Sequence, residues 1–295
     1  MIAVHIGFPK CASTSLQRHL FRNHSQIRYL ASASKGGSGA HSVEVERLIQ
    51  TLKSQAASPD AVQEALKELK ALADVQNDRD CVTLFSDEAL IRRLPAPVLR
   101  QTLDEAMILC VVREPVEYYK SAYHQYLKGL GTKFGTPLSP DQWFERFMAA
   151  RGDDFQKLVS YLESFGADQV RILPFEWLKT TPEAFARSLA RALSIEEGQT
   201  IELLKRPPLN LRISNISMLA KRVKAVSPPL WRILTSGPLA PIRRYAKRLV
   251  EKPVNFEFST ELQRRIRDVT VAPCTELQAV TGLDLRSMGY PVAGA

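Results

Sequence analysis

Residues 107–112, Met-Ile-Leu-Cys-Val-Val, restrict the fold of this chain most strongly, because all six are apolar. A strand with one face in water alternates apolar and polar residues, whereas a strand covered on both faces is apolar throughout. The segment therefore predicts a central strand of a parallel sheet. It ends abruptly at Arg113-Glu114-Pro115, where a proline in the first turn predicts a helix over residues 115–128.

Further apolar strands alternate with helical patterns along the first two thirds of the chain. This alternation predicts an α/β fold with a mostly parallel sheet flanked by helices. A Ser/Gly-rich stretch at residues 31–40 is expected to form a loop. The other strands are expected at residues 2–6, 81–85 and 169–174, and the other helices at residues 13–23, 42–54, 58–73, 95–106, 140–150, 155–165 and 182–193.

The last third of the chain has a different character, because prolines break it into short segments and the clear strands stop. We expect residues 1–205 to form the α/β core and residues 206–295 to form a mostly helical C-terminal part that packs on the core within the same domain. Helices are expected there at residues 219–226 and 261–277. Peripheral membrane contact through this basic part is the alternative, since Leu230 and Trp231 lie among many arginines and lysines.

The charge balance is basic, with 40 Lys and Arg against 31 Asp and Glu and a net charge of +9. This excess favours an anionic ligand, nucleic acid or an acidic membrane surface, without choosing among them. The four cysteines contain no Cys-x-x-Cys pair, so we expect reduced thiols and no zinc site. No run approaches the roughly 20 apolar residues of a membrane span, and no signal-peptide pattern precedes the first strand, so we expect a cytoplasmic protein.

The first sixteen residues predict an anion-binding turn. Residues 2–6 are rich in β-branched side chains and indicate a buried strand, which Gly7-Phe8-Pro9 ends. Lys10-Cys11-Ala12-Ser13-Thr14-Ser15 then leads into a helix, whose free N–H donors and partial positive charge suit a phosphate. The Walker A pattern of the nucleotide-binding P-loop is absent, so an ordinary strand-to-helix turn with a serine cap stays open at this point.

Polar side chains follow three of the expected strands, and the carboxyl ends of parallel strands are where ligands bind. The first strand supplies Lys10 and the hydroxyls of residues 13–15, and the third supplies Arg113. Lys10 and Arg113 could therefore hold two separate anionic groups. The strand at residues 81–85 is followed by Ser86-Asp87-Glu88, whose carboxylates could act as a base or merely form ion pairs.

These segments together carry a resemblance to a known family. Residues 8–16, with the Pro9-Lys10 pair and three successive hydroxyls, resemble the 5′-phosphosulfate loop of sulfotransferases that use 3′-phosphoadenosine 5′-phosphosulfate (PAPS). Residues 111–124 are similar to the family's 3′-phosphate motif, in which a serine follows an arginine by eight residues, as Ser121 follows Arg113. Residues 170–193 and 281–285 resemble later segments of the family, including its Pro-Phe-Glu sequence, so the resemblance spans nearly the whole chain.

The resemblance implies a P-loop-like central sheet and a set of site residues. Lys10 would neutralise charge on the leaving 5′-phosphate, within a cofactor-binding loop formed by Lys10, Cys11, Ala12, Ser13, Thr14 and Ser15. Arg113, with Ser121, would bind the 3′-phosphate. Glycine often stands in the family where this chain has Ala12, and alanine leaves the backbone less conformational freedom.

Glu88 is the residue that the resemblance favours as the catalytic base. The histidine of the cytosolic members has no clear counterpart here, whereas Leu84-Phe85-Ser86-Asp87-Glu88 is similar to carbohydrate and bacterial members that use a glutamate. Asp87 is the nearest competitor. The family's chemistry requires no metal, and the sequence shows no cluster of metal ligands.

The sequence as a whole predicts a PAPS-dependent sulfotransferase. The expected acceptor is a hydroxyl compound, either a carbohydrate or a small molecule, and no nucleic-acid partner is expected. The alternatives are a nucleotide kinase-like phosphotransferase, against which the missing Walker lysine argues, and a non-catalytic protein that binds nucleotide or membrane through its basic half.

Overall fold

The computed structural model describes residues 1–32, 42–54, 56–74, 80–87, 90–129, 138–205 and 257–294. Within these residues the chain forms a sheet of five parallel strands in the order β2-β3-β1-β4-β5. The predicted parallel α/β architecture is therefore confirmed. The strands are β1 (Ile2–His5), β2 (Ile27–Leu30), β3 (Val82–Ser86), β4 (Met107–Val112) and β5 (Val170–Pro174).

β1 and β4 are hydrogen-bonded neighbours at the centre of the sheet, with Val4 in register with Ile108. β4 is buried from Ile108 onward, as its unbroken apolar sequence predicted. From β1 the chain continues to β2 toward one edge of the sheet, whereas from β4 it continues to β5 toward the other edge. Adjacent strands whose connections diverge in this way open a crevice at their carboxyl ends, where α/β proteins bind ligands.

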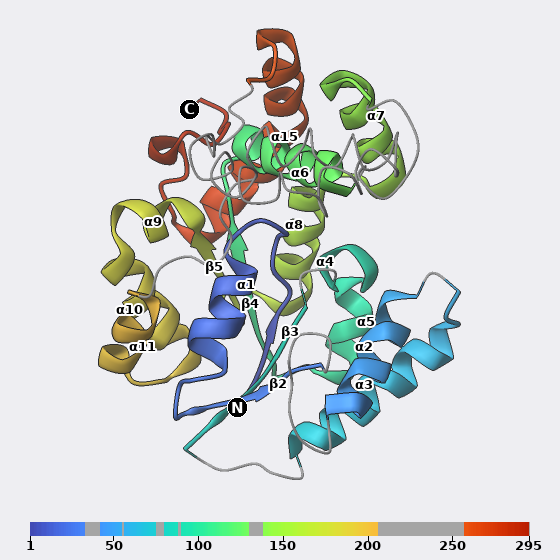
Figure 1. Ribbon diagram of the computed structural model, residues 1–295, viewed down its shortest axis with the longest axis vertical. Helices are drawn as coiled ribbons and strands as arrows, with labels where there is room; N and C mark the ends of the chain where they lie inside the picture. Colours follow the sequence, from blue (N-terminus) through green and yellow to red (C-terminus); the bar gives the residue numbers. More distant parts are fainter. Residues whose placement is uncertain are drawn as a thin grey trace, which may run out of the picture. The chain divides into compact units, whose positions relative to one another are not determined.

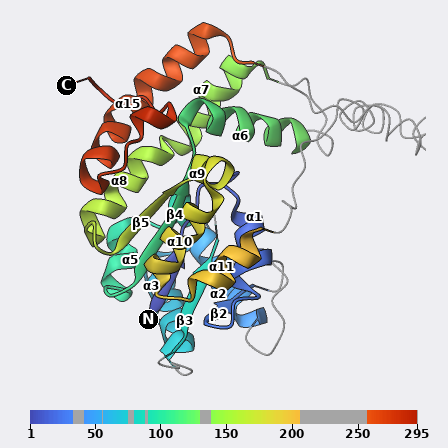
Figure 2. The same ribbon diagram turned by 90° about the vertical axis from the view of Figure 1, so that its left-hand side faces the viewer.

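The chain divides into two compact units, of which the first contains the sheet and comprises residues 1–115, 151–209 and 266–295. Its helices form two groups, which Figures 1 and 2 show on opposite sides of the sheet. The first group is α1 (Ser13–Ser15), the π-helix η1 (Leu16–Phe21), α9 (Phe175–Thr180), α10 (Pro182–Leu193) and α11 (Glu197–Leu204), and the second is α2 (Ser42–Lys53), α3 (Pro59–Asp74), α4 (Leu90–Arg93), α5 (Ala96–Thr102) and α8 (Asp154–Phe165).

The second unit comprises residues 116–150 and 210–265, of which residues 130–137 and 210–256 lie outside the described part of the chain. Its described core is aromatic: Tyr119 meets Phe144 and Phe147 edge to face, with centroids 5.1 and 5.6 Å apart. Such edge-to-face pairs stabilise a helix packing beyond the area that they bury. Its described helices are α6 (Pro115–Gly129), α7 (Pro140–Arg151) and the first turns of α15 (Thr260–Thr281). The rest of α15 belongs to the first unit and precedes the short helix η4 (Arg286–Met288).

The structure departs from the predicted elements in several places. The helix predicted over residues 13–23 begins as α1 and continues as the π-helix η1, and β2 was not predicted at all. β2 contains Arg28, whose guanidinium donates to the carbonyl oxygen of Leu72 at 3.0 Å, so a tertiary contact accommodates a charge in a short strand. Helices α4, α9 and α11 were also not predicted. Residues 33–40 of the loop predicted at residues 31–40, and the helix predicted at residues 219–226, lie outside the described residues.

Candidate functional site

The loop after β1 has the backbone geometry of an anion-binding nest. Lys10 and Ala12 adopt the left-handed region, with φ of 73° and 62°. Pro9, which precedes Lys10, and Cys11, which lies between the two, do not have positive φ. Such an alternation is typical of a nest, in which backbone N–H groups face one concave side that binds an anion. The Cys11 N–H is instead used within the loop, where it donates to the Phe8 carbonyl at 3.3 Å. The nest leads into α1 and η1, and the Leu16 N–H already donates to the Ala12 carbonyl at 3.0 Å. The predicted phosphate turn therefore has a suitable backbone.

Gly7 is required where the strand enters this loop. It has φ of +22°, and a Cβ there would lie 2.8 Å from the Cε1 and Nε2 atoms of the buried His5 ring. The His5 ring is held from its other side, since Nδ1 lies 2.7 Å from the Ser86 hydroxyl, to which the Gln17 amide donates at 2.9 Å. One hydrogen-bonded chain thus ties β1, β3 and η1 together directly beneath the loop.

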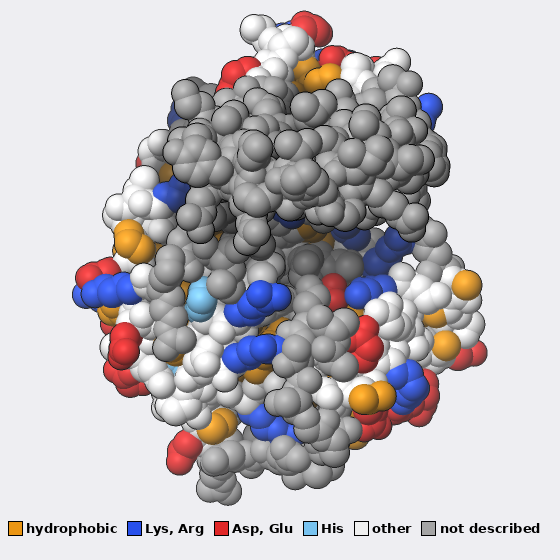
Figure 3. All heavy atoms as spheres, in the orientation of Figure 1, with side chains coloured by type: hydrophobic (Ala, Val, Ile, Leu, Met, Phe, Trp, Pro, Cys, Tyr) orange, Lys and Arg blue, Asp and Glu red, His pale blue; other side chains and the backbone are white. Residues whose placement is uncertain are grey.

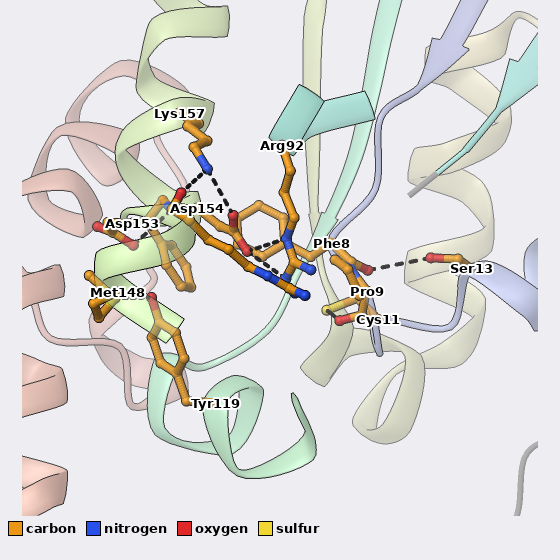
Figure 4. Close-up of polar contacts among 12 residues, drawn as sticks. Phe8, Pro9, Cys11, Ser13, Arg92, Tyr119, Met148, Asp153, Asp154 and Lys157 are labelled. Atoms are coloured by element: carbon orange, nitrogen blue, oxygen red, sulfur yellow. Dashed lines mark hydrogen bonds and ion pairs between the residues drawn. The ribbon is translucent and has the colours of Figure 1, made fainter. Parts of the chain in front are cut away.

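The side chains of the predicted loop residues divide into two kinds. Lys10, Thr14 and Ser15 are half-exposed, so their polar groups can reach a ligand. The Ser13 hydroxyl is buried and donates to the Phe8 carbonyl at 3.4 Å, which ties the loop to itself (Figure 4). Burial raises the pKa of the Cys11 thiol above its usual range, so Cys11 contributes a neutral side chain rather than a thiolate.

Arg113 lies at the end of β4, beside this loop. Its side chain is only 6% exposed, and its guanidinium sits over the ring of Phe175, 5.1 Å from the centroid. The positive charge of Arg113 lowers the pKa of Cys11, although burial outweighs it and raises that pKa. Because β1 and β4 are neighbouring strands, the arginine and the nest follow adjacent strand ends. The structure therefore brings together the lysine loop and the arginine that the sequence predicted a hundred residues apart.

A carboxylate that the sequence reasoning did not single out lies beside Arg113. Glu176, at the start of α9, accepts the backbone N–H of Glu114 at 3.1 Å, and its second oxygen accepts the Tyr290 hydroxyl at 2.9 Å. The only sequence signal for it was the Pro-Phe-Glu segment of the family resemblance, which carried no role. Nothing in the sequence around Tyr290 indicated a role in the site, because its hydrogen-bond partner, Glu176, lies 114 residues earlier.

Asp87 and Glu88 follow β3, next to β1. Asp87 is buried, and its carboxylate forms an ion pair with Lys53 of α2 at 3.2 Å. Lys53 was not predicted as a site residue, because nothing in the sequence of α2 distinguishes it from a surface lysine. Glu88, the predicted base, lies outside the described residues, and its role stays a prediction.

Ser121 is half-buried within α6 and belongs to the second unit, whereas Arg113 belongs to the first. Their shared role at a 3′-phosphate therefore stays a prediction as well. In the same unit, Lys120 is held by Glu257 at 2.6 Å and Glu117 at 3.0 Å.

Beneath the loop, a buried ion pair supports the apolar packing of the nest. Phe8 packs against Phe155 of α8, with centroids 4.9 Å apart. The preceding residue, Asp154, is fully buried, and one of its oxygens accepts from Nε and Nη2 of Arg92 at 2.9 and 2.7 Å (Figure 4). Lys157 lies 3.5 Å from the other oxygen. Opposite charges therefore satisfy this carboxylate where water is excluded.

The surface of the first unit is basic near the nest. On the face shown in Figure 3, Lys and Arg side chains gather over the region of α1 and η1. Clustered positive charge raises the local concentration of anionic ligands. Among the described residues, no group of three or more His, Cys, Asp or Glu side chains is placed to hold a metal ion, and none of their helices is long and apolar enough to cross a membrane.

Comparison with known proteins gives matches among solved structures alone. No protein-family model matches the chain, and no curated protein matches its sequence. The sulfotransferase of Alicyclobacillus acidocaldarius is 18% identical, with a TM-score of 0.46 over 82% of this chain and 98% of that one. Mouse sulfotransferase SULT7A1, solved with PAP, is 13% identical, with a TM-score of 0.49 over 92% of this chain and 83% of that one. The sulfotransferase domain from the curacin biosynthetic pathway is 13% identical, with a TM-score of 0.41 over 86% of this chain and 98% of that domain. These three solved structures are described as sulfotransferases, the family whose motifs the sequence resembles.

Proposed function

We propose that this protein is a sulfotransferase that moves a sulfuryl group from PAPS to an acceptor hydroxyl. One observation carries the proposal: the Lys10 nest and the buried Arg113 follow β1 and β4, which are adjacent strands with diverging connections. A nest and an arginine side by side suit a ligand with two separate anionic groups. PAPS has this chemistry, because its 3′-phosphate and its 5′-phosphosulfate lie on opposite sides of one ribose.

Each group has a role that follows from its place. The N–H groups of residues 10, 12 and 13 and the half-exposed Thr14 and Ser15 hydroxyls would hold the 5′-phosphate, and Arg113 would hold the 3′-phosphate. A guanidinium is suited to this because its planar array of donors matches phosphate oxygens two at a time. Because Arg113 is desolvated on one side by Phe175, its charge is weakly screened and its discrimination is strong.

The transfer step needs positioning and charge stabilisation more than covalent chemistry by the protein. A bond forms between the acceptor oxygen and sulfur while the bond from sulfur to the 5′-phosphate oxygen breaks. Lys10 would neutralise the charge that grows on that leaving oxygen. Glu88 would accept the proton of the acceptor hydroxyl, a contribution worth roughly 10²–10⁴-fold in rate. We propose a carbohydrate or a small hydroxyl compound as acceptor, on the strength of the glutamate pattern at residues 84–88.

The first test compares nucleotides by thermal stabilisation, since a ligand that binds only the folded state raises the melting temperature. We expect 3′-phosphoadenosine 5′-phosphate (PAP) to stabilise the protein more than 5′-AMP or ATP, and Arg113→Ala to abolish this difference. Equal stabilisation by all three, or preference for ATP, would reject the proposal and favour a kinase-like protein.

The second test concerns the base. Glu88→Gln should bind PAP as the parent protein does and lose sulfuryl transfer, measured with labelled PAPS and a panel of carbohydrate and small hydroxyl acceptors. A fully active Glu88→Gln variant would exclude Glu88 as the base and leave nucleotide binding to be judged by the first test.

A further inference from the structure

Two residues to which the sequence motifs assign no role contact Arg113 and the peptide that follows it. Arg113 is held from two directions by one dipeptide, because Phe175 lies under its guanidinium and Glu176 accepts the N–H of the next peptide, that of Glu114. The ring fixes the end of the side chain, and the carboxylate fixes the peptide plane from which the side chain departs. Both contacts lie within the first unit.

Glu176 is in turn held by the C-terminal segment. Its second oxygen accepts the hydroxyl of Tyr290, which is only 3% exposed. Burial, reinforced by the Glu176 charge, raises the pKa of Tyr290 well above its usual value, so the hydroxyl remains a donor across the ordinary pH range. A charge-assisted hydrogen bond in such a dry place is stronger than a neutral one.

A second contact joins the same two segments. Arg267 of α15 lies 3.7 Å from a carboxylate oxygen of Glu114 and donates to the carbonyl of Gly289 at 3.2 Å. The C-terminal segment therefore contacts the β4–α6 junction in two ways. Arg267 contacts Glu114 directly, and Tyr290 contacts it indirectly through Glu176. Residues at the far end of the chain therefore set the geometry of the junction that presents Arg113.

We propose that Glu176 and Tyr290 are positioning residues that set the 3′-phosphate selectivity of Arg113, an inference that rests on the proposed function. The Tyr290 hydroxyl orients the Glu176 carboxylate, which orients the Arg113–Glu114 peptide. The C-terminal segment is then part of the nucleotide-selecting apparatus although it supplies no ligand to the nucleotide. Outer contacts of this kind matter because small misplacements of a binding group reduce affinity strongly.

The experiment measures the ratio of the dissociation constants for 5′-AMP and PAP by titration calorimetry on the full chain. This ratio isolates the contribution of the 3′-phosphate. Tyr290→Phe removes one hydroxyl and keeps the ring, and we expect it to lower the ratio roughly tenfold, within the usual size of couplings between contacting residues. Glu176→Gln keeps an acceptor for the Glu114 N–H, cannot accept from Tyr290 through its amide nitrogen, and should lower the ratio similarly.

The matched control is Tyr161→Phe. Tyr161 is also a buried tyrosine of the first unit, and its hydroxyl donates to the Leu94 carbonyl at 2.8 Å. Tyr161→Phe also removes one buried hydroxyl, so this variant should lose about as much stability as Tyr290→Phe. The ratio of the dissociation constants for 5′-AMP and PAP should stay unchanged. A ratio reduced equally in both variants would show that general destabilisation is responsible and would overturn the inference.

A double variant separates a positioning role from a merely structural one. In an Arg113→Ala background the 3′-phosphate preference is already lost, so adding Tyr290→Phe should change the ratio no further. If the parent protein shows no preference for PAP, the proposed function itself fails. If the parent prefers PAP and Tyr290→Phe keeps the full preference, the positioning inference fails and the proposed function stands.

Discussion

The guanidinium of Arg113 lies over the aromatic ring of Phe175, with Cζ 5.1 Å from the ring centroid. Phe175→Leu keeps an apolar side chain and removes the π face, whose attraction to a cation is worth about 0.5–2 kcal/mol. We expect PAP to bind about twofold to thirtyfold more weakly to this variant, with 5′-AMP binding unchanged, as measured by titration calorimetry.

Lys179 provides the control for that change, because its exposed Nζ lies 4.9 Å from the centroid of the same ring. Lys179→Met removes a positive charge near Phe175 without touching Arg113, and PAP affinity should stay unchanged. If both variants weaken PAP binding equally, the effect is one of net charge and the stacking of Arg113 has no special part in it.

The left-handed conformation of Ala12 explains why glycine suits this place in the loop. Ala12 has φ of 62° and ψ of 9°, a region that costs a residue with a Cβ about 1–2 kcal/mol. Ala12→Gly should therefore raise the free energy of unfolding by about 0.5–1 kcal/mol in urea titrations, after the entropy of the added glycine is subtracted. Ala71→Gly on the exposed face of α3 makes the same chemical change at a helical residue and should lower stability by about 1 kcal/mol. Two losses of similar size would contradict the strain argument.

Individual strands show which parts of the fold could be predicted from the sequence and which could not. β4 was predicted with its observed bounds because all of its residues are apolar, a pattern that only a strand covered on both faces requires. β2 was missed because Arg28 and Tyr29 interrupt its apolar residues, and its pairing with β3 is a tertiary contact that no local pattern records. Residues 16–21 were expected to be helical and are so, but as a π-helix, which residue types do not distinguish.

The candidate site divides in the same way. Lys10 and Arg113 were singled out because each lies shortly after a recognisable strand. Lys53, Glu176 and Tyr290 could not, since each is defined by a partner distant in the sequence: Asp87, Glu114 and Glu176 respectively. Charged residues on helices are mostly surface residues, and only the three-dimensional fold shows which of them meet a buried partner.

The cysteines differ in exposure, and this predicts their reactivity. Cys11, Cys110 and Cys274 are buried, and burial raises the pKa of each thiol, whereas Cys81 is half-exposed. Because the thiolate is the reactive form, a maleimide at pH about 8 should label Cys81 alone in the native protein. Mass spectrometry of the labelled protein would check this, and Cys81→Ser should remove the native label. Rapid native labelling at Cys11 would show that the loop opens.

The Glu196 carboxylate is expected to make the stability of the folded protein depend on pH in the acid range. Its carboxylate caps α11 by accepting the N–H groups of Gln199 and Gly198, which lower its pKa below the usual 4.5. A lowered folded-state pKa contributes stability that is fully present above pH 4.5 and is lost as the pH falls through the folded-state value. Glu196→Gln should therefore lower the melting temperature at pH about 7, with the difference from the parent shrinking in acid. Glu202→Gln, an exposed change on the same helix, should lower the melting temperature less at pH about 7.

The Arg92–Asp154 pair beneath the nest should be among the most sensitive polar contacts of the first unit. Asp154→Asn preserves the shape of the side chain but removes the negative charge that faces the Arg92 guanidinium. The Arg92 side chain is only 14% exposed. Breaking one side of a buried pair costs about 3–5 kcal/mol, because the remaining charge stays desolvated. Glu68→Gln breaks the surface pair with Arg47, whose side chains are 36% and 57% exposed, and should cost less than about 1 kcal/mol. Urea unfolding of both variants measures the contrast, and equal small losses would mean that water reaches Arg92 and that the pair does not support the packing of Phe8 on Phe155.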